Sequence, residues 1–178
     1  AESTQDKYMG NITNGADLFD FEGYKIYRAT DFEFNDAYNI TDGDGNPTFL
    51  EPYVQNGMRA QWDLVDGKSG WHPVDLNGIK FYLGDDTGLT HSYVDNNVVN
   101  GQRYYYAVVS YDYGGDLSNN IIPSDSPMKL RVNPLTGVVS LGPNVVEVVP
   151  SSPSAGFVDA SFAGDQIDHV YGASSGEV

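Results

Sequence analysis

The sequence of 178 residues contains no cysteine. Disulfide bonds, thiol catalysis and thiolate metal sites are therefore excluded. Basic residues are also scarce, since 9 Lys and Arg stand against 25 Asp and Glu and give a formal charge of -16 at pH 7. This charge repels the phosphates of nucleic acids and anionic membrane surfaces, so neither is expected as a partner. It leaves carboxylates available for cations.

Long apolar runs are missing as well. No stretch approaches the roughly 20 apolar residues of a membrane-spanning helix, so we expect no membrane span. Helical periodicity is nearly absent, because no long segment keeps apolar residues at i, i+3, i+4 and i+7. The 20 glycines and 9 prolines are instead spread along the chain. Together these absences exclude a predominantly helical protein.

The most informative segment that is present is residues 103–113, RYYYAVVSYDY. Tyrosine and valine favour strands, and the Gly114-Gly115 pair that follows is typical of a turn. Both alternate sets of side chains are unusually apolar, whereas a strand with one solvated face alternates apolar and polar residues. We therefore expect both faces of this strand to be covered.

Other strand candidates follow one another along the chain, separated by turn residues. They lie at residues 22–29, 61–66, 79–83, 91–95, 128–132 and 144–149, with shorter ones at 156–162 and 167–171. Residues 1–20 are polar and rich in Asn, Asp and Gly, and we expect an irregular arm there. The pattern predicts an all-β fold, a β-sandwich.

Three segments together resemble fibronectin type III-like modules, in particular those of large secreted or cell-surface bacterial proteins. They are FEGYKIYRAT at 21–30, HSYVDNNVVNGQRYYYAVVSYDYGG at 91–115 and IIPSDSPMKLRV at 121–132. The resemblance implies an immunoglobulin-like sandwich in which these segments supply strand C, strand F and the start of strand G. It also implies an extracellular or cell-surface location and a core between two sheets lined by Tyr24, Ile26, Tyr104, Tyr106 and Val108.

The chain departs from such a module at both ends. Only about 20 mostly polar residues precede the strand-C segment, where strands A and B are expected, and residues 31–90 carry a long insertion. We expect an irregular arm (1–20), a fibronectin type III-like sandwich (21–143) and a C-terminal β extension (144–178). The surplus strands of the extension allow three arrangements. They complete the sheet of their own chain, open the next module of a longer protein, or complete the sheet of a neighbouring copy.

The missing strands and the surplus tail favour a structural function, because an incomplete sheet exposes unpaired N–H and C=O groups that template another chain. We expect an extracellular, self-assembling filament subunit whose copies join by β-strand complementation into a homopolymer. The expected assembly interface is Tyr105, Val109, Tyr111, Val145, Val146, Val148 and Val149. The alternative is an adhesive or ligand-binding module of a longer cell-surface protein, stiffened by calcium.

One acidic turn has the beginning of a calcium loop. Asp42, Asp44 and Asn46 supply oxygen ligands at positions 1, 3 and 5. An EF-hand would continue with Gly and Glu at positions 6 and 12, where this chain has Pro47 and Tyr53. Two interpretations therefore stay open, a calcium turn of another kind and an ordinary Asx turn between strands. Calcium is the only cofactor that the sequence suggests.

No arrangement of residues predicts catalysis, and we expect no enzyme. The histidines are far apart and lack the spacing of a transition-metal site; they are His72, His91 and His169. No nucleophile with an adjacent base stands out. Aromatic residues allow one further interpretation, since a sugar-stacking patch would need exposed rings such as Trp62, Trp71 and Tyr82. The competing interpretation places these rings in the core or as loop anchors.

Overall fold

The computed structural model describes residues 20–38, 40–115, 117 and 120–156, and its fold is all-β. Within those residues the helical structure is a single 3-10 turn, η1 (Asn35–Ala37). No helix in this part of the chain has the length and apolarity to cross a membrane. The prediction of an all-β fold is confirmed.

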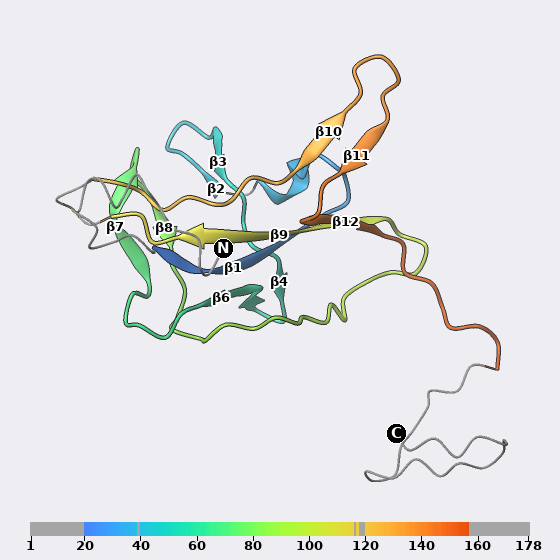
Figure 1. Cartoon of the computed structure of the whole chain (residues 1–178), viewed down its shortest axis with the longest axis horizontal. Coiled ribbons are helices and arrows are strands. Elements are labelled where there is room, and N and C mark those ends of the chain that lie inside the picture. The colour runs from blue at the N-terminus through green and yellow to red at the C-terminus, as the bar shows by residue number, and fades with distance from the viewer. Residues whose placement is uncertain (1–19, 39, 116, 118–119, 157–178) are drawn as a thin grey trace, which may run out of the picture.

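The central element is a four-stranded antiparallel sheet in the order β12-β9-β1-β6. Its strands are β1 (Phe21–Ala29), β6 (Gln61–Asp63), β9 (Tyr104–Asp112) and β12 (Val145–Val148). The two nine-residue strands, β1 and β9, pair along almost their whole length, from Phe21 opposite Asp112 to Ala29 opposite Tyr105. The segment that dominates the sequence therefore lies at the centre of the fold (Figure 1).

Four two-stranded ladders surround this sheet. They are β2 (Ile40–Thr41) with β3 (Pro47–Phe49), β4 (Val54–Gln55) with β5 (Met58–Arg59), β7 (Trp71–Leu76) with β8 (Ile79–Tyr82), and β10 (Leu130–Val132) with β11 (Val139–Leu141). Two of these hairpins turn on an Asn-Gly pair, at 56–57 and 77–78, and both residues of each pair have positive φ. Such a pair matches the right-handed twist of the flanking strands.

One face of the sheet is the core of the chain, and we call it the covered face. It is formed by the odd-numbered residues of β1 and β9, including Tyr27, Ala29, Tyr105, Ala107, Val109 and Tyr111, all of them buried. Phe34 and Ala37 of the η1 region pack on it, together with Leu50, Met128, Leu130 and Leu141. Figure 1 shows the hairpins β2–β3 and β10–β11 on this side of the sheet.

A buried ion pair lies within the covered face. The Lys25 ammonium is 3.1 Å from the Asp125 carboxylate and 3.5 Å from the centre of the Phe81 ring. The Tyr27 hydroxyl donates a hydrogen bond to the same carboxylate. Burial lowers the pKa of Lys25 to about 8, and the Asp125 charge opposes that shift. The charge is therefore kept in the core only because one carboxylate and the aromatic rings compensate its lost hydration.

The even-numbered residues form the opposite face, which we call the open face. Ile26 lies opposite Val108, and Val146 lies opposite Tyr106 in the register of the strands. Val108 is 49% exposed and Val146 is 52% exposed. In Figure 1 the chain between β8 and β9 runs along this side of the sheet. It includes the predicted strand 91–95, which forms no strand in the structure.

The two faces of the long strand are therefore exchanged relative to the sequence prediction. Val108 was expected in the core, and Tyr105, Val109 and Tyr111 were expected to face a neighbour, but these three are buried inside the chain. The physical reason is the long insertion, because Phe34, Leu50 and Phe81 come from it and pack on the odd-numbered side. Tyr104 is buried as expected.

The C-terminal extension completes the sheet of its own chain. β12 pairs antiparallel with β9, from Val145 opposite Ala107 to Val148 opposite Tyr104, and Val145 joins the core. The boundary expected at residue 143 therefore falls inside the sheet. Of the three arrangements that the sequence allows, the structure has the first. The candidates at 156–162 and 167–171 and the arm at 1–19 lie outside the described residues, apart from Gly156.

The edge beside β9 is filled by two separate segments. Residues 124–126 pair with its C-terminal end, where Tyr111 bridges Asp125, and β12 pairs with its N-terminal half. Between them the chain leaves the sheet as the β10–β11 hairpin. Asn144 holds the base of the β10–β11 hairpin in place, since its side-chain amide donates hydrogen bonds to the Val108 and Pro127 carbonyls at 3.3 and 3.2 Å. The strands predicted at 128–132 and 144–149 are present as β10 and β12.

Candidate functional site

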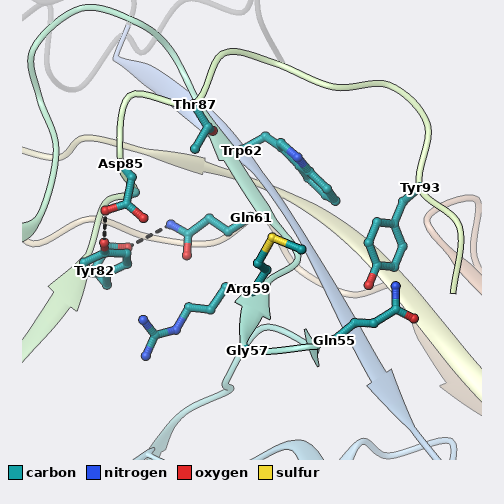
Figure 2. Close-up of a pocket in the computed structure, with 11 residues that line it drawn as sticks. Gln55, Gly57, Arg59, Gln61, Trp62, Tyr82, Asp85, Thr87 and Tyr93 are labelled. Atoms are coloured by element: carbon teal, nitrogen blue, oxygen red, sulfur yellow. Dashed lines mark hydrogen bonds between the residues drawn. The ribbon is translucent and has the colours of Figure 1, made fainter. Parts of the chain in front are cut away.

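A hollow of about 490 Å³ opens beside β6, between the β4–β5 hairpin and the end of β8. Its walls carry three aromatic rings, Trp62, Tyr82 and Tyr93, and five polar side chains, Gln55, Arg59, Gln61, Asp85 and Thr87. Figure 2 shows Trp62 and Tyr93 on one side, Tyr82, Asp85 and Arg59 on the other, and Gln61 between them. The volume lies within the roughly 300–1,000 Å³ of small-molecule sites.

The floor of the hollow is fixed by Gln61. Its side-chain nitrogen donates to the carbonyl oxygens of Tyr82 and Leu83 at 3.0 and 2.8 Å and lies 3.1 Å from the Tyr111 hydroxyl. These bonds join β6 to the end of β8 and to the centre of the sheet. Because Gln61 makes these hydrogen bonds within the chain, the side chains around it are held in place before any ligand binds.

Gly84 allows the two sides of the hollow to approach each other. Its φ is 137°, and a Cβ atom there would lie 2.3 Å from a carboxylate oxygen of Asp63. Only glycine fits this contact and this backbone conformation. The Asp63 carboxylate in turn accepts hydrogen bonds from the backbone N–H groups of Asp86 and Thr87 at 2.6 and 2.8 Å. The loop that carries Asp85 is thereby anchored to β6.

The aromatic wall consists of Trp62 and Tyr93. Their ring centres are 5.4 Å apart with planes inclined at 61°, and Tyr53 packs edge-on against Tyr93 at 6.5 Å. The Tyr93 hydroxyl oxygen is buried and has no hydrogen-bond partner in the structure. Burial raises the pKa of Tyr93 above its ordinary value. An unpaired buried hydroxyl is costly, so a movement of the ring that gave this oxygen a partner would be favourable.

The polar wall is formed by Tyr82, Asp85 and Arg59. The Tyr82 hydroxyl donates to the Asp85 carboxylate, and this bond, followed by burial, raises the pKa of Tyr82 to about 12. The Arg59 guanidinium lies 5.0 Å from the Tyr82 ring centre, and its nearest carboxylate oxygen, on Glu51, is 4.0 Å away. That separation exceeds hydrogen-bonding distance, so guanidinium N–H groups remain available.

The segment that carries Tyr93 is held by Gln55 of the β4–β5 hairpin. The Gln55 amide nitrogen donates to the Val94 carbonyl at 3.1 Å, and its amide oxygen accepts from the Asn96 N–H at 2.7 Å. This segment therefore gains through a side chain the main-chain hydrogen bonds that a strand partner would supply. One amide N–H of Gln55 remains for another acceptor.

Asp95 fastens the same segment to the open face. Its carboxylate accepts from Arg28 at 2.8 Å, from the Tyr106 hydroxyl at 2.7 Å and from the Tyr53 hydroxyl at 3.2 Å. Burial alone would raise the pKa of Asp95, but the hydrogen bonds from Tyr106, from the Asn97 backbone and from Arg28 lower it below its ordinary value. The aromatic wall is consequently rigid relative to the sheet.

A second hollow of about 340 Å³ lies on the other side of the aromatic wall. It shares Trp62 and Tyr93 with the first and is otherwise lined by Tyr24, Ile26, Val108 and residues 90–92. The two hollows therefore adjoin each other across one Trp-Tyr pair. The second one lies directly on the apolar open face.

The predicted calcium loop is held together by its own hydrogen bonds. One Asp42 oxygen accepts from the backbone N–H groups of Asp44 and Asn46 at 3.0 and 2.8 Å. The bonds from Asn46, side chain and backbone, lower the pKa of Asp42. Within residues 20–156, apart from the four undescribed positions, no three His, Asp or Glu side chains are placed to hold a metal ion together. Calcium binding by Asp42, Asp44 and Asn46 stays a prediction.

The predicted assembly residues fall into two groups. Tyr105, Val109, Tyr111 and Val145 are buried inside the chain, and three others are exposed at the surface of the sheet or just beyond it, namely Val146, Val148 and Val149. Only the second group is available to a partner in this conformation.

The suggested aromatic patch is partly assembled. Trp62 and Tyr82 line the same hollow, whereas Trp71 packs on Tyr82 at 5.0 Å from outside and is 59% exposed.

Tyr93 and Arg59 also line the hollow but were not predicted from the sequence. The Asn56-Gly57 pair was the available signal for Arg59, because a hairpin there places residue 59 next to the strand that carries Trp62. No local signal pointed to Tyr93.

A buried carboxyl group lies at the start of β1, outside both hollows. Glu22 is fully buried, and neither of its carboxyl oxygens has a hydrogen-bond partner among the residues that the structure describes. Burial, assisted by the charges of Asp66, Asp63 and Asp86, raises the pKa of Glu22 to about 8, although Lys68 opposes the shift. The group is therefore protonated in most molecules at neutral pH.

Comparisons with protein-family models, with curated proteins and with solved structures give no significant match to this chain.

Proposed function

We propose that this chain is a non-enzymatic, extracellular ligand-binding module with a fibronectin type III-like sheet, and that its ligand site is the hollow beside β6. The observation that carries the proposal is the preformed wall of three aromatic rings and five polar side chains around about 490 Å³. Convergent polar groups on an aromatic surface are typical of binding sites. The sheet order β12-β9-β1-β6 supports the resemblance, because strands F and C are neighbours in such modules.

The chemistry of the hollow favours binding over catalysis. Its only carboxylate, Asp85, accepts the hydroxyl hydrogen of Tyr82, and its only cation is Arg59. A general acid and base need groups whose pKa values lie near the working pH. A site with one engaged carboxylate and one permanently charged guanidinium is suited to recognition through hydrogen bonds.

The two tryptophans allow a direct test. Replacing Trp71 by Phe leaves Trp62 as the only tryptophan, so emission changes report on the hollow. We expect at least one class of small ligand, in a panel of sugars, peptides, nucleosides and amino acids, to shift this emission saturably at millimolar concentration or below. The same ligand should change the emission of a Trp62→Phe variant less, because Trp71 does not line the hollow and packs only on the Tyr82 ring of its wall. An absence of response to every class would overturn the proposal.

We propose self-assembly as a second candidate function, because the sheet has an apolar open face and an edge strand. Val108, Val146 and Val148 are exposed on that face, and β12 lies at the edge of the sheet. An edge strand offers main-chain hydrogen bonds to an added strand, and exposed apolar side chains favour a partner. In this arrangement β12 receives a strand of a neighbouring copy in a homopolymer, whereas the sequence suggested that it would be donated.

Sedimentation over a hundredfold range of protein concentration tests this second candidate. We expect the average mass to rise with concentration, and we expect a Val146→Lys, Val148→Lys double variant to remain at 19.4 kDa. A wild-type chain that stays monomeric throughout would contradict self-assembly while leaving the ligand-binding proposal intact.

A further inference from the structure

We infer that the ligand of the two adjoining hollows is a neutral oligosaccharide of pyranose units, held across the Trp62–Tyr93 wall. This inference rests on the proposed ligand-binding function and names its substrate class. One sugar ring would occupy the hollow beside β6, and the next unit would lie over the open face. The chemistry of each wall supports this assignment.

The aromatic wall provides the apolar half of sugar recognition. A pyranose ring has one or two faces made only of C–H groups, and these faces pack on the surface of an aromatic ring. Trp62 lines both hollows, as does Tyr93, so each sugar unit would contact the same pair of rings from a different side. Rigid aromatic side chains lose little conformational entropy on binding, which makes them effective anchors.

The opposite walls provide the polar half. A sugar presents hydroxyl groups around the rim of its ring, and each hydroxyl both donates and accepts. Arg59 offers donors, Asp85 offers a carboxylate oxygen as acceptor, and Gln55 has one amide N–H left. The buried Tyr93 hydroxyl has no partner among the described residues, and a small shift of the ring would let it pair with a ligand hydroxyl. Donors and acceptors are thus mixed around the ring rather than gathered as one charge.

Charge excludes the main anionic alternatives. The chain carries a formal charge of -16, and the first hollow has one cation balanced by one carboxylate. Nucleotides, phosphorylated sugars and uronic acid polymers would meet repulsion from the whole surface without a compensating basic cluster. A neutral ligand avoids this cost.

Proline-rich peptides are the competing class, since they also dock on aromatic grooves. Such grooves bind an extended backbone through apolar ridges and need few polar groups. The first hollow is instead bounded on its far side by Arg59, Tyr82 and Asp85, which suits a ligand with hydroxyl groups at its rim. The sugar is therefore the better fit to both walls.

The test uses the whole chain with Trp71 replaced by Phe. Gluco-, xylo- and manno-oligosaccharides of two to six units are titrated while the emission of Trp62 is followed, and a proline-rich peptide is titrated in parallel. We expect saturable binding of at least one sugar series, with affinity rising by about tenfold or more between two and four units as the second hollow is filled. The peptide should cause no saturable change.

Variants then locate the binding site, with affinity measured by saturation-transfer NMR. We expect Trp62→Ala to weaken binding at least about tenfold and Tyr93→Phe about fivefold, the second through loss of one hydroxyl. Arg59→Gln should weaken binding about fivefold, while Tyr38→Phe, a conservative change at an exposed residue that lines neither hollow, should leave it unchanged. Circular dichroism and melting temperature establish that each variant is folded. If Trp62→Ala does not fold, Tyr93→Phe and Arg59→Gln carry the test.

Two outcomes would overturn the inference. One is the absence of saturable binding by every neutral oligosaccharide in the panel at concentrations up to about 10 mM, which is where even a weak site would begin to saturate. In that case, binding of the peptide or of another class of ligand would preserve the ligand-binding proposal and contradict only the assignment of a sugar as the ligand. The other is sugar binding that neither Tyr93→Phe nor Arg59→Gln weakens, which would place the sugar elsewhere on the chain.

Discussion

The covered face and the open face belong to the same strands and have similar apolar side chains, yet they differ in almost every physical respect. On the covered face Val109 is 1% exposed, and on the open face its neighbour Val108 is 49% exposed. The first face carries the core and a buried ion pair. The second carries a hollow and adjoins the larger one through the Trp62–Tyr93 wall, and its valines are accessible.

This difference shows that apolarity does not decide which face of a sheet is covered. The covering elements come from the insertion between β1 and β9 and from the β10–β11 excursion, and both cross the odd-numbered side. The even-numbered side is crossed by one irregular segment, held by Gln55 and Asp95. A single extended segment leaves room beside it, and that room is the second hollow.

The largest effect is expected from the ion pair of the covered face. Asp125→Ala leaves the Lys25 ammonium buried without a carboxylate, and the free energy of unfolding should fall by roughly 3–5 kcal/mol. Chemical denaturation at pH 7 measures this change. The control is Glu147→Ala, which breaks the exposed pair with Arg103 and should cost less than about 0.5 kcal/mol. Equal losses in the two variants would contradict the description of the covered face.

Adjacent valines give a matched pair for the two faces. Val109→Ala removes two buried methyl groups and should lower the free energy of unfolding by roughly 1–3 kcal/mol, whereas Val108→Ala should cost less than about 0.5 kcal/mol. Urea denaturation of both variants provides the comparison. A larger loss for Val108→Ala would mean that the open face is the true core.

Glu22, at the irregular start of β1, adds a pH dependence to the stability of the fold. Its pKa is about 8 in the folded chain against an ordinary 4.5, so the folded state holds a proton that the unfolded state has released between these pH values. This contribution to stability is fully present below pH 4.5 and is lost as the pH rises through 8. We expect Glu22→Gln to be more stable than wild type by about 1 kcal/mol or more at pH 8, with a difference that shrinks toward pH 4.5.

Denaturation across that pH range checks the result. A difference between Glu22→Gln and wild type that stays constant from pH 4.5 to 8 would remove the titration of Glu22 as its cause. The exposed change Glu147→Gln is the control, and its effect on stability should not depend on pH in the same way.

The smallest effect on stability is expected from Asn144, at the base of the β10–β11 hairpin on the covered face. Asn144→Ala removes hydrogen bonds to the Val108 and Pro127 carbonyls and from the Lys129 N–H. The free energy of unfolding should fall by roughly 0.5–1.5 kcal/mol. Hydrogen exchange of the β10–β11 amides should also accelerate more than that of β1. Uniform acceleration across both regions would argue against a local fastening role.

The sequence predicted the elements of the central sheet better than their arrangement. The dense β-branched and aromatic residues of 103–113 and 22–29 identified β9 and β1, because such residues favour strands. Which face would be covered depended on residues 31–90 and 127–143, whose contacts with the sheet span long sequence separations. The pairing of residues 144–149 with β9 was one of three open arrangements, since strand preference does not name a partner.

The candidate site was predictable only in fragments. Trp62 and Tyr82 were singled out as aromatic residues that a sugar could contact, and they do line one hollow. Tyr93 was placed in a strand, but the HSYVD segment is held by side chains and leaves its ring against Trp62. Local sequence cannot encode such an arrangement, because it depends on Gln55 and Asp95 reaching groups that are distant along the chain.

The most direct test of the difference between the two faces uses the absence of cysteine, which makes single-cysteine variants unambiguous. Val108→Cys and Val109→Cys are each treated with a thiol reagent under native conditions, and each rate is divided by the rate of the same variant in denaturant. We predict that the Val108→Cys variant reacts within about tenfold of its unfolded rate, and the Val109→Cys variant at least about a hundredfold more slowly, because it must wait for unfolding. Equal rates, or the reverse order, would contradict the assignment of the covered and open faces.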